Sequence, residues 1–195
     1  MRIGVQQSCQ TRAPRLPVTL LHERANGYDA RFTVASGDNV LAESYFEDFE
    51  PGRVFAGANR ITLDAESIKA FAAEFDPQPF HLDEEAAGRS IFSGLAASGW
   101  HTSAVTMRLL IDGDLRVAGG LVGLGVEELR WPRAVRPGDE LRVDAEVLEV
   151  RESKSRPQQG LVRVRITTLN QRDEVVQVSV NTIIVPRCPR AAAEG

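Results

Sequence analysis

Three long stretches in the last third of the chain alternate between apolar and polar residues. The first, LRVDAEVLEV at 141–150, is followed by LVRVRITTLN at 161–170 and by VVQVSVNTIIV at 175–185. A period of two residues is typical of strands that bury one face. The connections, a charged loop at 151–160 and the turn QRDE at 171–174, are short enough for hairpins. The pattern therefore predicts consecutive antiparallel strands whose apolar face must be covered.

Helices are expected to cover that face. In LDAESIKAFAAEF, Asp64 is a suitable N-cap, and apolar residues follow at the spacing of one helix face. Pro77 ends this helix, because the residue before a proline is driven out of the α region. A shorter helical piece is expected at 81–90 and a longer helix at 93–112, whose small first residues favour close packing. Four residues of the longer helix fall near one stripe: Ala97, Trp100, Ala104 and Met107.

The order of these elements predicts an α+β fold in which an antiparallel sheet wraps a central helix. A first strand is expected at 53–62, and another at 119–131. The glycines of GLVGLG, within the second of these, are in the wrong order for a dinucleotide-binding loop, and we interpret them as strand glycines that allow close backbone approach. Residues 1–43 are expected to form a poorly ordered extension, 44–187 the folded domain and 188–195 a tail.

Composition narrows the classes of function. The 195 residues, 43% hydrophobic and 26% charged, can bury the core of one domain. A net charge of -4 argues against a nucleic-acid partner. The apolar runs are too short for a membrane helix and the N-terminus lacks a secretory signal, so we expect a cytoplasmic protein with no membrane partner. With two cysteines, Cys9 and Cys188, and three histidines, neither a disulfide framework nor a metal site is expected.

The sequence DPQPFH at 76–81 holds a carboxylate and an imidazole on a stiff bend. Two prolines fix φ between Asp76 and His81, and apolar neighbours lower the local dielectric, which makes each group more sensitive to the other. A helix start downstream offers free N–H groups and a positive dipole end. Together these are the parts needed for chemistry next to a carbonyl. The alternative interpretation is structural: an Asp that ends a helix and a histidine packed in the core.

DPQPFH resembles the hydratase signature of the MaoC-like dehydratases and (R)-specific enoyl-CoA hydratases. FSGLAASGWHTSAVTMRL at 92–109 and RWPRAVRPGDEL at 130–141 are similar to later segments of the same family, so the resemblance covers residues 45 to 187. The sequence departs from the family pattern at two positions. Gln78 stands where the signature has Asn, and Phe75 where a Gly often precedes the Asp. Both departures suggest a differently shaped pocket.

The resemblance implies a hot-dog fold, a curved antiparallel sheet around a long central helix, in a homodimer. It also implies an acyl-CoA thioester substrate bound at the subunit interface, with no metal and no separate cofactor, because CoA enters as part of the substrate. By position, Asp76 and His81 match the catalytic pair, and Gly94 matches the residue whose backbone N–H receives the thioester oxygen. Thr102 falls where the family often has a small hydroxyl residue.

Other polar residues are candidates for substrate binding or for structure. Arg130, Arg133 and Arg136 could contact CoA phosphates or could be solvated arginines at strand edges. His101 is expected to be a packed histidine rather than a third catalytic group. The candidate substrate-binding residues are Gln78, Ser98, Thr102 and Arg133.

The leading hypothesis is an acyl-CoA hydratase or dehydratase. One alternative is a hot-dog thioesterase that activates water against the thioester carbon. The other is a catalytically silent acyl-binding subunit of a larger complex.

Overall fold

The computed structural model describes residues 43–189. The expected extension at 1–43 lies outside them except for its last residue, and so does most of the expected tail. Along the chain, the elements are η1 (Phe46–Asp48), β1 (Val54–Ala56), β2 (Ile61–Thr62), α1 (Ala65–Phe75), α2 (Pro79–Leu82), α3 (Glu84–Gly88), α4 (Gly99–Asp112), β3 (Val122–Arg130), β4 (Glu140–Glu152), β5 (Gln159–Leu169) and β6 (Val175–Pro186).

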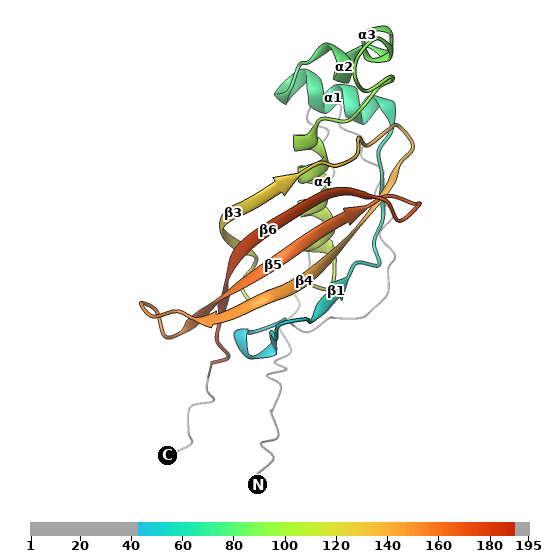
Figure 1. Ribbon diagram of the computed structural model, residues 1–195. Helices are drawn as coiled ribbons and strands as arrows, with labels where there is room; N and C mark the ends of the chain where they lie inside the picture. Colours follow the sequence, from blue (N-terminus) through green and yellow to red (C-terminus); the bar gives the residue numbers. More distant parts are fainter. Residues whose placement is uncertain (1–42, 190–195) are drawn as a thin grey trace, which may run out of the picture.

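One antiparallel sheet runs in the order β1, β4, β5, β6, β3, and the short β2 pairs with β4. The alternating segments form the two expected hairpins, β4 with β5 and β5 with β6, and the register places Ala145 opposite Ile166 and Ile166 opposite Ser179. The strands cross in front of α4 in Figure 1, so the sheet wraps one side of this helix. The predicted inward face of β4 is buried: Leu141, Val143, Ala145 and Val147. The predicted fold class is confirmed.

The core lies between α4 and the sheet. Leu109 of α4 is 1% exposed, and it belongs to the same buried cluster as Leu141 of β4 and Val164 of β5. Ile68 of α1 extends this cluster toward the other helices. Burying one such side chain stabilises the fold by roughly 1.5–3 kcal/mol, so the contact between α4 and the sheet is a main source of stability.

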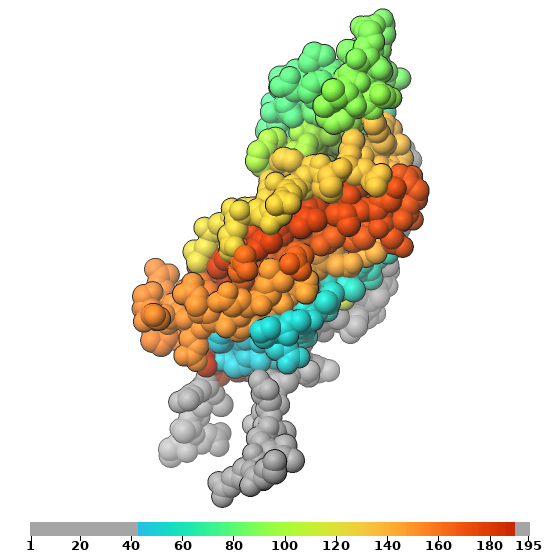
Figure 2. Space-filling view, viewed as in Figure 1, coloured from blue at the N-terminus to red at the C-terminus, as the bar shows by residue number. Residues whose placement is uncertain are grey.

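Helices α1, α2 and α3 form a group that projects from one end of the sheet, as Figures 1 and 2 show. The predicted N-cap of α1 is confirmed, because Asp64 Oδ1 accepts from the Ser67 N–H at 2.8 Å. The projecting group packs on the start of α4 and carries the bend that contains Asp76 and His81.

Three local expectations were wrong. The strand expected at 53–62 is divided into β1 and β2, which both pair with β4, and in the segment between them the Arg60 guanidinium donates to Gly57 O at 2.9 Å and to Ala58 O at 3.1 Å. The helical piece expected from His81 starts earlier, at Pro79, and splits into α2 and α3. The long helix starts at Gly99 and not at 93, since the preceding segment is bonded to the chain before β4: Ala97 N–H donates to Val135 O at 2.9 Å.

An apolar surface remains exposed on α4 and β3. Of the predicted stripe, Trp100 is 60% and Met107 48% exposed, whereas Ala97 lies before α4 and is buried. Ile111 of α4 is also exposed, at 51%. Apolar side chains of β3 are exposed as well: Val122, Leu124 and Val126. The close backbone approach predicted for the glycines of β3 is not made within residues 43–189, because a Cβ at Gly123 or Gly125 would meet nothing within 4 Å.

Residues 43–189 include no helix with both the length and the apolar character that crossing a membrane requires.

Candidate active site

Asp76 stands where α1 ends. Its N–H closes the last turn on Ala72 O at 3.0 Å, and its φ of -150° and ψ of 69° take the chain out of the helix. Pro77 cannot continue an α-helix, and the next N–H, that of Gln78, turns back to Asp76 O at 2.7 Å. The result is a tight bend at Asp76, whose side chain is 23% exposed.

His81 is held by the short helix that follows. Pro79 occupies the first position of α2, where a missing N–H costs nothing. The imidazole is buried, and Nδ1 lies 2.7 Å from the carbonyl oxygen of Ala96. A carbonyl can only accept, so Nδ1 must carry the proton of this hydrogen bond. In the neutral ring, Nε2 therefore has a free lone pair.

The two side chains meet. His81 Nε2 lies 3.5 Å from Asp76 Oδ2, which is longer than a good direct hydrogen bond. Both atoms are acceptors when His81 is neutral, so neither can donate to the other, and a molecule with two donors, such as water, can hydrogen-bond to both. The sequence predicted that the stiff bend would bring these groups together, and the structure has that geometry.

Ser98 fixes the orientation of the carboxylate. Its Oγ donates to Asp76 Oδ2 at 2.7 Å and accepts from the Trp100 N–H at 3.1 Å, as the N-cap of α4. The residue is completely buried. Ser98 was expected to bind substrate, and the structure instead places its hydroxyl between Asp76 and the first turn of α4. A serine before a helical run is a common N-cap, and that signal could have placed the helix start correctly.

Gly94 was expected to offer its N–H to the thioester oxygen, and this expectation is corrected. The Gly94 N–H already donates to Ala87 O at 3.0 Å, and the residue lies in the loop before α4 at φ +148°. Gly99 is the first residue of α4, where an N–H has no acceptor within its own helix. A Cβ on Gly99 would lie 2.7 Å from the Trp131 indole, so close packing explains the glycine.

The other predicted binding residues do not join this cluster through their side chains. Thr102 is buried, and its Oγ1 donates to Ser98 O at 3.2 Å along the helix. Arg133 forms an ion pair with Glu174 at 3.3 Å. The side chain of Gln78 is exposed at the bend.

His101 is a packed histidine, as expected. It is 3% exposed and stacks on Phe71 with the ring centroids 4.6 Å apart and the planes at 4°. Burial lowers the pKa of His101 to about 4, although the nearby Asp64 acts in the opposite direction. At neutral pH the ring is therefore uncharged.

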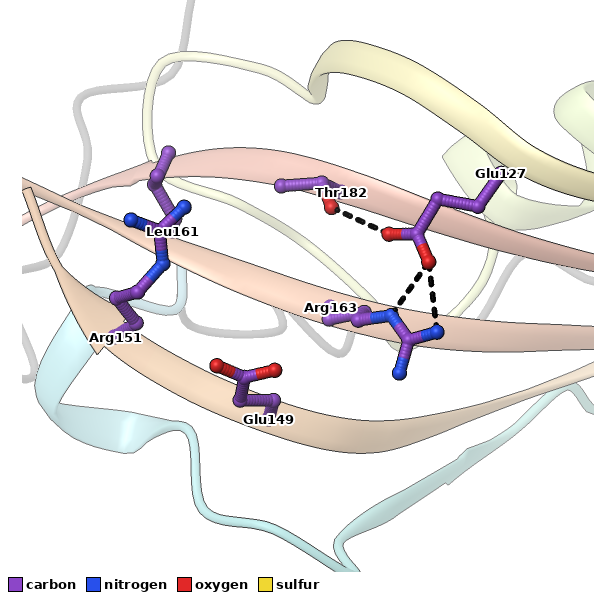
Figure 3. Close-up of a pocket in the computed structure, with 6 residues that line it drawn as sticks. All are labelled: Glu127, Glu149, Arg151, Leu161, Arg163 and Thr182. Carbon is purple, nitrogen blue, oxygen red and sulfur yellow. Dashed lines mark hydrogen bonds and ion pairs between the residues drawn. The ribbon is translucent and has the colours of Figure 1, made fainter.

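Residues 43–189 contain no group of three or more His, Cys, Asp or Glu side chains placed to hold a metal ion. A cavity of about 260 Å³ lies elsewhere, on the exposed face of the sheet, and Figure 3 shows Glu127 bridging Arg163 and Thr182 within it. Its lining includes neither Asp76 nor His81.

Comparison with known proteins identifies the family of this chain. Residues 47–170 match the family model described as "MaoC like domain". "Uncharacterized protein YdeM" of Bacillus subtilis (strain 168) is 30% identical over 141 residues, which are 72% of this chain and 98% of that protein.

Solved structures align as well. A MaoC-like dehydratase from Rhodospirillum rubrum has 55% identity and a TM-score of 0.72, over 75% of this chain and 99% of that one. Unliganded R-hydratase PhaJ1 from Pseudomonas aeruginosa has 25% identity and a TM-score of 0.56, over 73% of this chain and 86% of that one. RV0216 from Mycobacterium tuberculosis, described as a double hotdog fold, has 24% identity and a TM-score of 0.59, over 76% of this chain and 46% of that one. The sheet around one helix is therefore a hot-dog fold. This chain therefore belongs to the MaoC-like family of hydratases and dehydratases.

Proposed function

We propose that the protein adds water across the 2,3 double bond of an enoyl thioester, or removes it from a 3-hydroxyacyl thioester, with Asp76 and His81 as the catalytic pair. The main support is the convergence of His81 Nε2 and Asp76 Oδ2, 3.5 Å apart. Each group has its own anchor, since Ala96 O holds the imidazole and Ser98 Oγ holds the carboxylate. A base whose orientation is fixed beforehand loses little entropy at the moment of reaction.

In the hydration direction, one water occupies the position between the two acceptors. As its oxygen attacks the β-carbon, the pair takes one water proton, with Nε2 as the acceptor that the Nδ1–H tautomer leaves open. The α-carbon then receives a proton from the same pair, so one molecule of water is added in total. Because both steps use the same pair, they occur on one face of the double bond. Dehydration follows the same path in reverse.

The negative charge that develops on the thioester oxygen needs a hydrogen-bond donor. We assign this role to the Gly99 N–H at the first turn of α4, in place of Gly94. The positive end of the helix dipole acts in the same direction. Loss of one such donor typically costs about 3–4 kcal/mol in the barrier, so the geometry of this turn matters for the rate.

The proposed substrate is an acyl-CoA thioester, and CoA is brought in by the substrate itself. The proposed assembly is a homodimer in which a second copy covers the apolar surface of α4 and β3. Two observations support it. Trp100, Met107 and Leu124 are about half exposed, and among residues 43–189 β3 is an edge strand whose one neighbour is β6. An exposed edge next to an apolar patch is a typical place for association with another chain.

A direct test is to incubate the purified protein with enoyl-CoA thioesters of several chain lengths and to follow the loss of the conjugated enoyl absorbance. The proposal predicts loss of absorbance and formation of one 3-hydroxyacyl-CoA enantiomer, without release of free thiol. Thiol release with the enoyl absorbance retained would support a thioesterase instead. No turnover on any of these substrates would support a silent acyl-binding subunit.

A further inference from the structure

Arg136 contacts the backbone next to the site and not an acid. It lies in the loop between β3 and β4, and its guanidinium donates to Gly94 O at 2.7 Å, to Leu95 O at 3.1 Å and to Phe92 O. No carboxylate within residues 43–189 forms an ion pair with this side chain. By contrast, Arg163 and Arg165 on the exposed sheet face are each paired with a glutamate.

The carbonyls that Arg136 binds belong to a segment with a direct effect on the catalytic pair. We call residues 92–97 the strap. Its next carbonyl, that of Ala96, is the one that receives the His81 Nδ1–H. Ser98, the residue that follows the strap, donates a hydrogen bond to the Asp76 carboxylate. A displacement of Leu95 therefore reaches the anchors of both catalytic groups within three residues.

Arg136 is one of several supports of the strap, since Leu95 and Ala97 are also buried in the core cluster. The strap forms no helix, and Gly94 has a backbone conformation at φ +148° that L side chains rarely adopt. Backbone N–H groups of the strap bond to the chain before and after it: Ala97 N–H to Val135 O at 2.9 Å, Gly94 N–H to Ala87 O at 3.0 Å, Ser93 N–H to Ser90 O at 3.0 Å and Phe92 N–H to Ser90 Oγ at 3.1 Å. Arg136 holds the strap through carbonyls instead. Arg136 is itself aligned by Asp139, which accepts from the Arg136 backbone N–H at 2.8 Å.

The chemistry of the side chain suits this task. A guanidinium is planar, permanently charged and rich in donors, so it can serve several carbonyls that lie side by side. The ammonium group of a lysine carries the same charge at a single nitrogen, so it cannot donate to several carbonyls in one plane as a guanidinium does. The planar shape of the Arg136 guanidinium therefore orients the strap carbonyls, in addition to the attraction of its charge.

We propose that Arg136 is a positioning residue for catalysis: by holding the strap carbonyls, it keeps Ala96 O aligned with His81 and so maintains the Nδ1–H tautomer that leaves Nε2 as the base. The catalytic part of this inference rests on the proposed hydratase activity. The structural part, the tautomer of His81, does not depend on turnover.

The first arm of the test measures rates. Arg136→Lys and Arg136→Gln should lower kcat by about 10- to 100-fold, because small misplacements of catalytic groups have effects of this size, while KM stays within a few-fold of the wild-type value. Guanidinium ion, at concentrations too low to denature, should restore part of the kcat of Arg136→Ala and none of that of Arg136→Lys. The matched control is Arg165→Gln, which removes an exposed arginine paired with Glu146 and should leave kcat unchanged.

The second arm observes the imidazole. In nitrogen-15 NMR spectra, wild-type His81 should be in the Nδ1–H form, and Arg136→Gln should shift it toward a mixture of tautomers. If His81 keeps the Nδ1–H form in Arg136→Gln, the inference is overturned whatever the rates are. An unchanged kcat in the Arg136 variants, with an active wild type, removes the catalytic role alone. A wild type that is inactive on every enoyl-CoA contradicts the proposed function, and the NMR arm still decides the inference.

Discussion

At the residue scale, the site is a short chain of hydrogen bonds that ends on two catalytic groups. Ser98 has two tasks, because it donates to Asp76 and also caps α4 through the Trp100 N–H. The sequence indicated Asp76 and His81, since both lie on one stiff bend within six residues. It could not indicate Ser98 as the partner of Asp76, since that contact joins residues 22 positions apart. Contacts of this kind depend on how helices pack and not on local pattern.

The variant Ser98→Ala tests whether the hydrogen bond from Ser98 to Asp76 affects the rate beyond the loss of stability that follows from removing an N-cap. Removing an N-cap costs about 1 kcal/mol, and freeing the carboxylate should lower kcat about 10-fold, an effect typical of lost support around a catalytic group. The matched control is Asp64→Ala, which removes the cap of α1 without touching Asp76. Steady-state kinetics and thermal unfolding of both variants check this. Equal loss of kcat in the two variants would mean that Ser98 acts through stability alone.

His101 gives the fold a pH dependence of known sign. Its pKa is about 4 in the folded protein and 6.5 as its ordinary value, so the unfolded chain binds more protons between those limits. The free energy of unfolding is therefore not reduced by His101 above pH 6.5. As the pH falls from 6.5 to about 4, it decreases by no more than about 1.4 kcal/mol per pH unit, because protons bind to His101 in the unfolded chain first. His101→Phe keeps a ring against Phe71 and should reduce the loss of melting temperature between pH 7 and pH 4.5. Parallel melting curves for wild type and variant would contradict this.

At the element scale, the periodic segments were predictable and the joints between them were not. The alternation of β4, β5 and β6 is a local signal of burial, and the structure confirms it. The apolar face of α1 is buried at Ile68 and Ala72, whereas Phe75 at the end of the helix is 62% exposed. The start of α4 depends on bonds to a distant segment: Val135 and Arg136 engage the strap, so its backbone groups are used outside any helix. The strand expected at 53–62 is divided at residues 57–60, where the Arg60 guanidinium binds backbone carbonyls.

The first turn of α4 is tightly packed, and Gly99→Ala tests this. The new Cβ would lie 2.7 Å from the Trp131 indole, so either the helix start or the indole must move. Overpacking typically costs about 1–3 kcal/mol, and kcat should fall because the proposed N–H donor moves with the turn. Gly88→Ala is the matched control, since a Cβ there meets nothing within 4 Å. Calorimetry and enoyl-CoA kinetics measure both effects. Wild-type behaviour of Gly99→Ala would remove Gly99 from the mechanism.

At the scale of the whole molecule, the protein is a sheet wrapped on one helix with one apolar side exposed. The resemblance found in the sequence predicted the fold class and the family, and both are confirmed. The homodimer remains a proposal. The apolar stripe of α4 was visible in the sequence, but a stripe alone does not tell whether it faces the core or a second chain, and here Leu109 faces inward while Met107 faces outward.

Leu124→Glu tests the assembly. A charge placed on the exposed β3 edge should disfavour its burial against a second copy. In light scattering after gel filtration, the wild type should have about twice the 21.4 kDa mass of the chain and the variant should approach that mass. Val54→Glu is the matched control, because Val54 is 56% exposed on β1, at the opposite edge of the sheet. If Val54→Glu dissociates the protein and Leu124→Glu does not, the proposed surface is the wrong one.

The central claim is that Asp76 and His81 act together on one water molecule. The most direct measurement is the initial rate of enoyl-CoA hydration by Asp76→Asn, by His81→Ala and by the double variant, with circular dichroism to confirm that each is folded. Each single change should lower kcat by at least about 100-fold, and the double variant should be little slower than either single one, because the two groups form one unit. A folded His81→Ala protein with wild-type kcat would contradict the account.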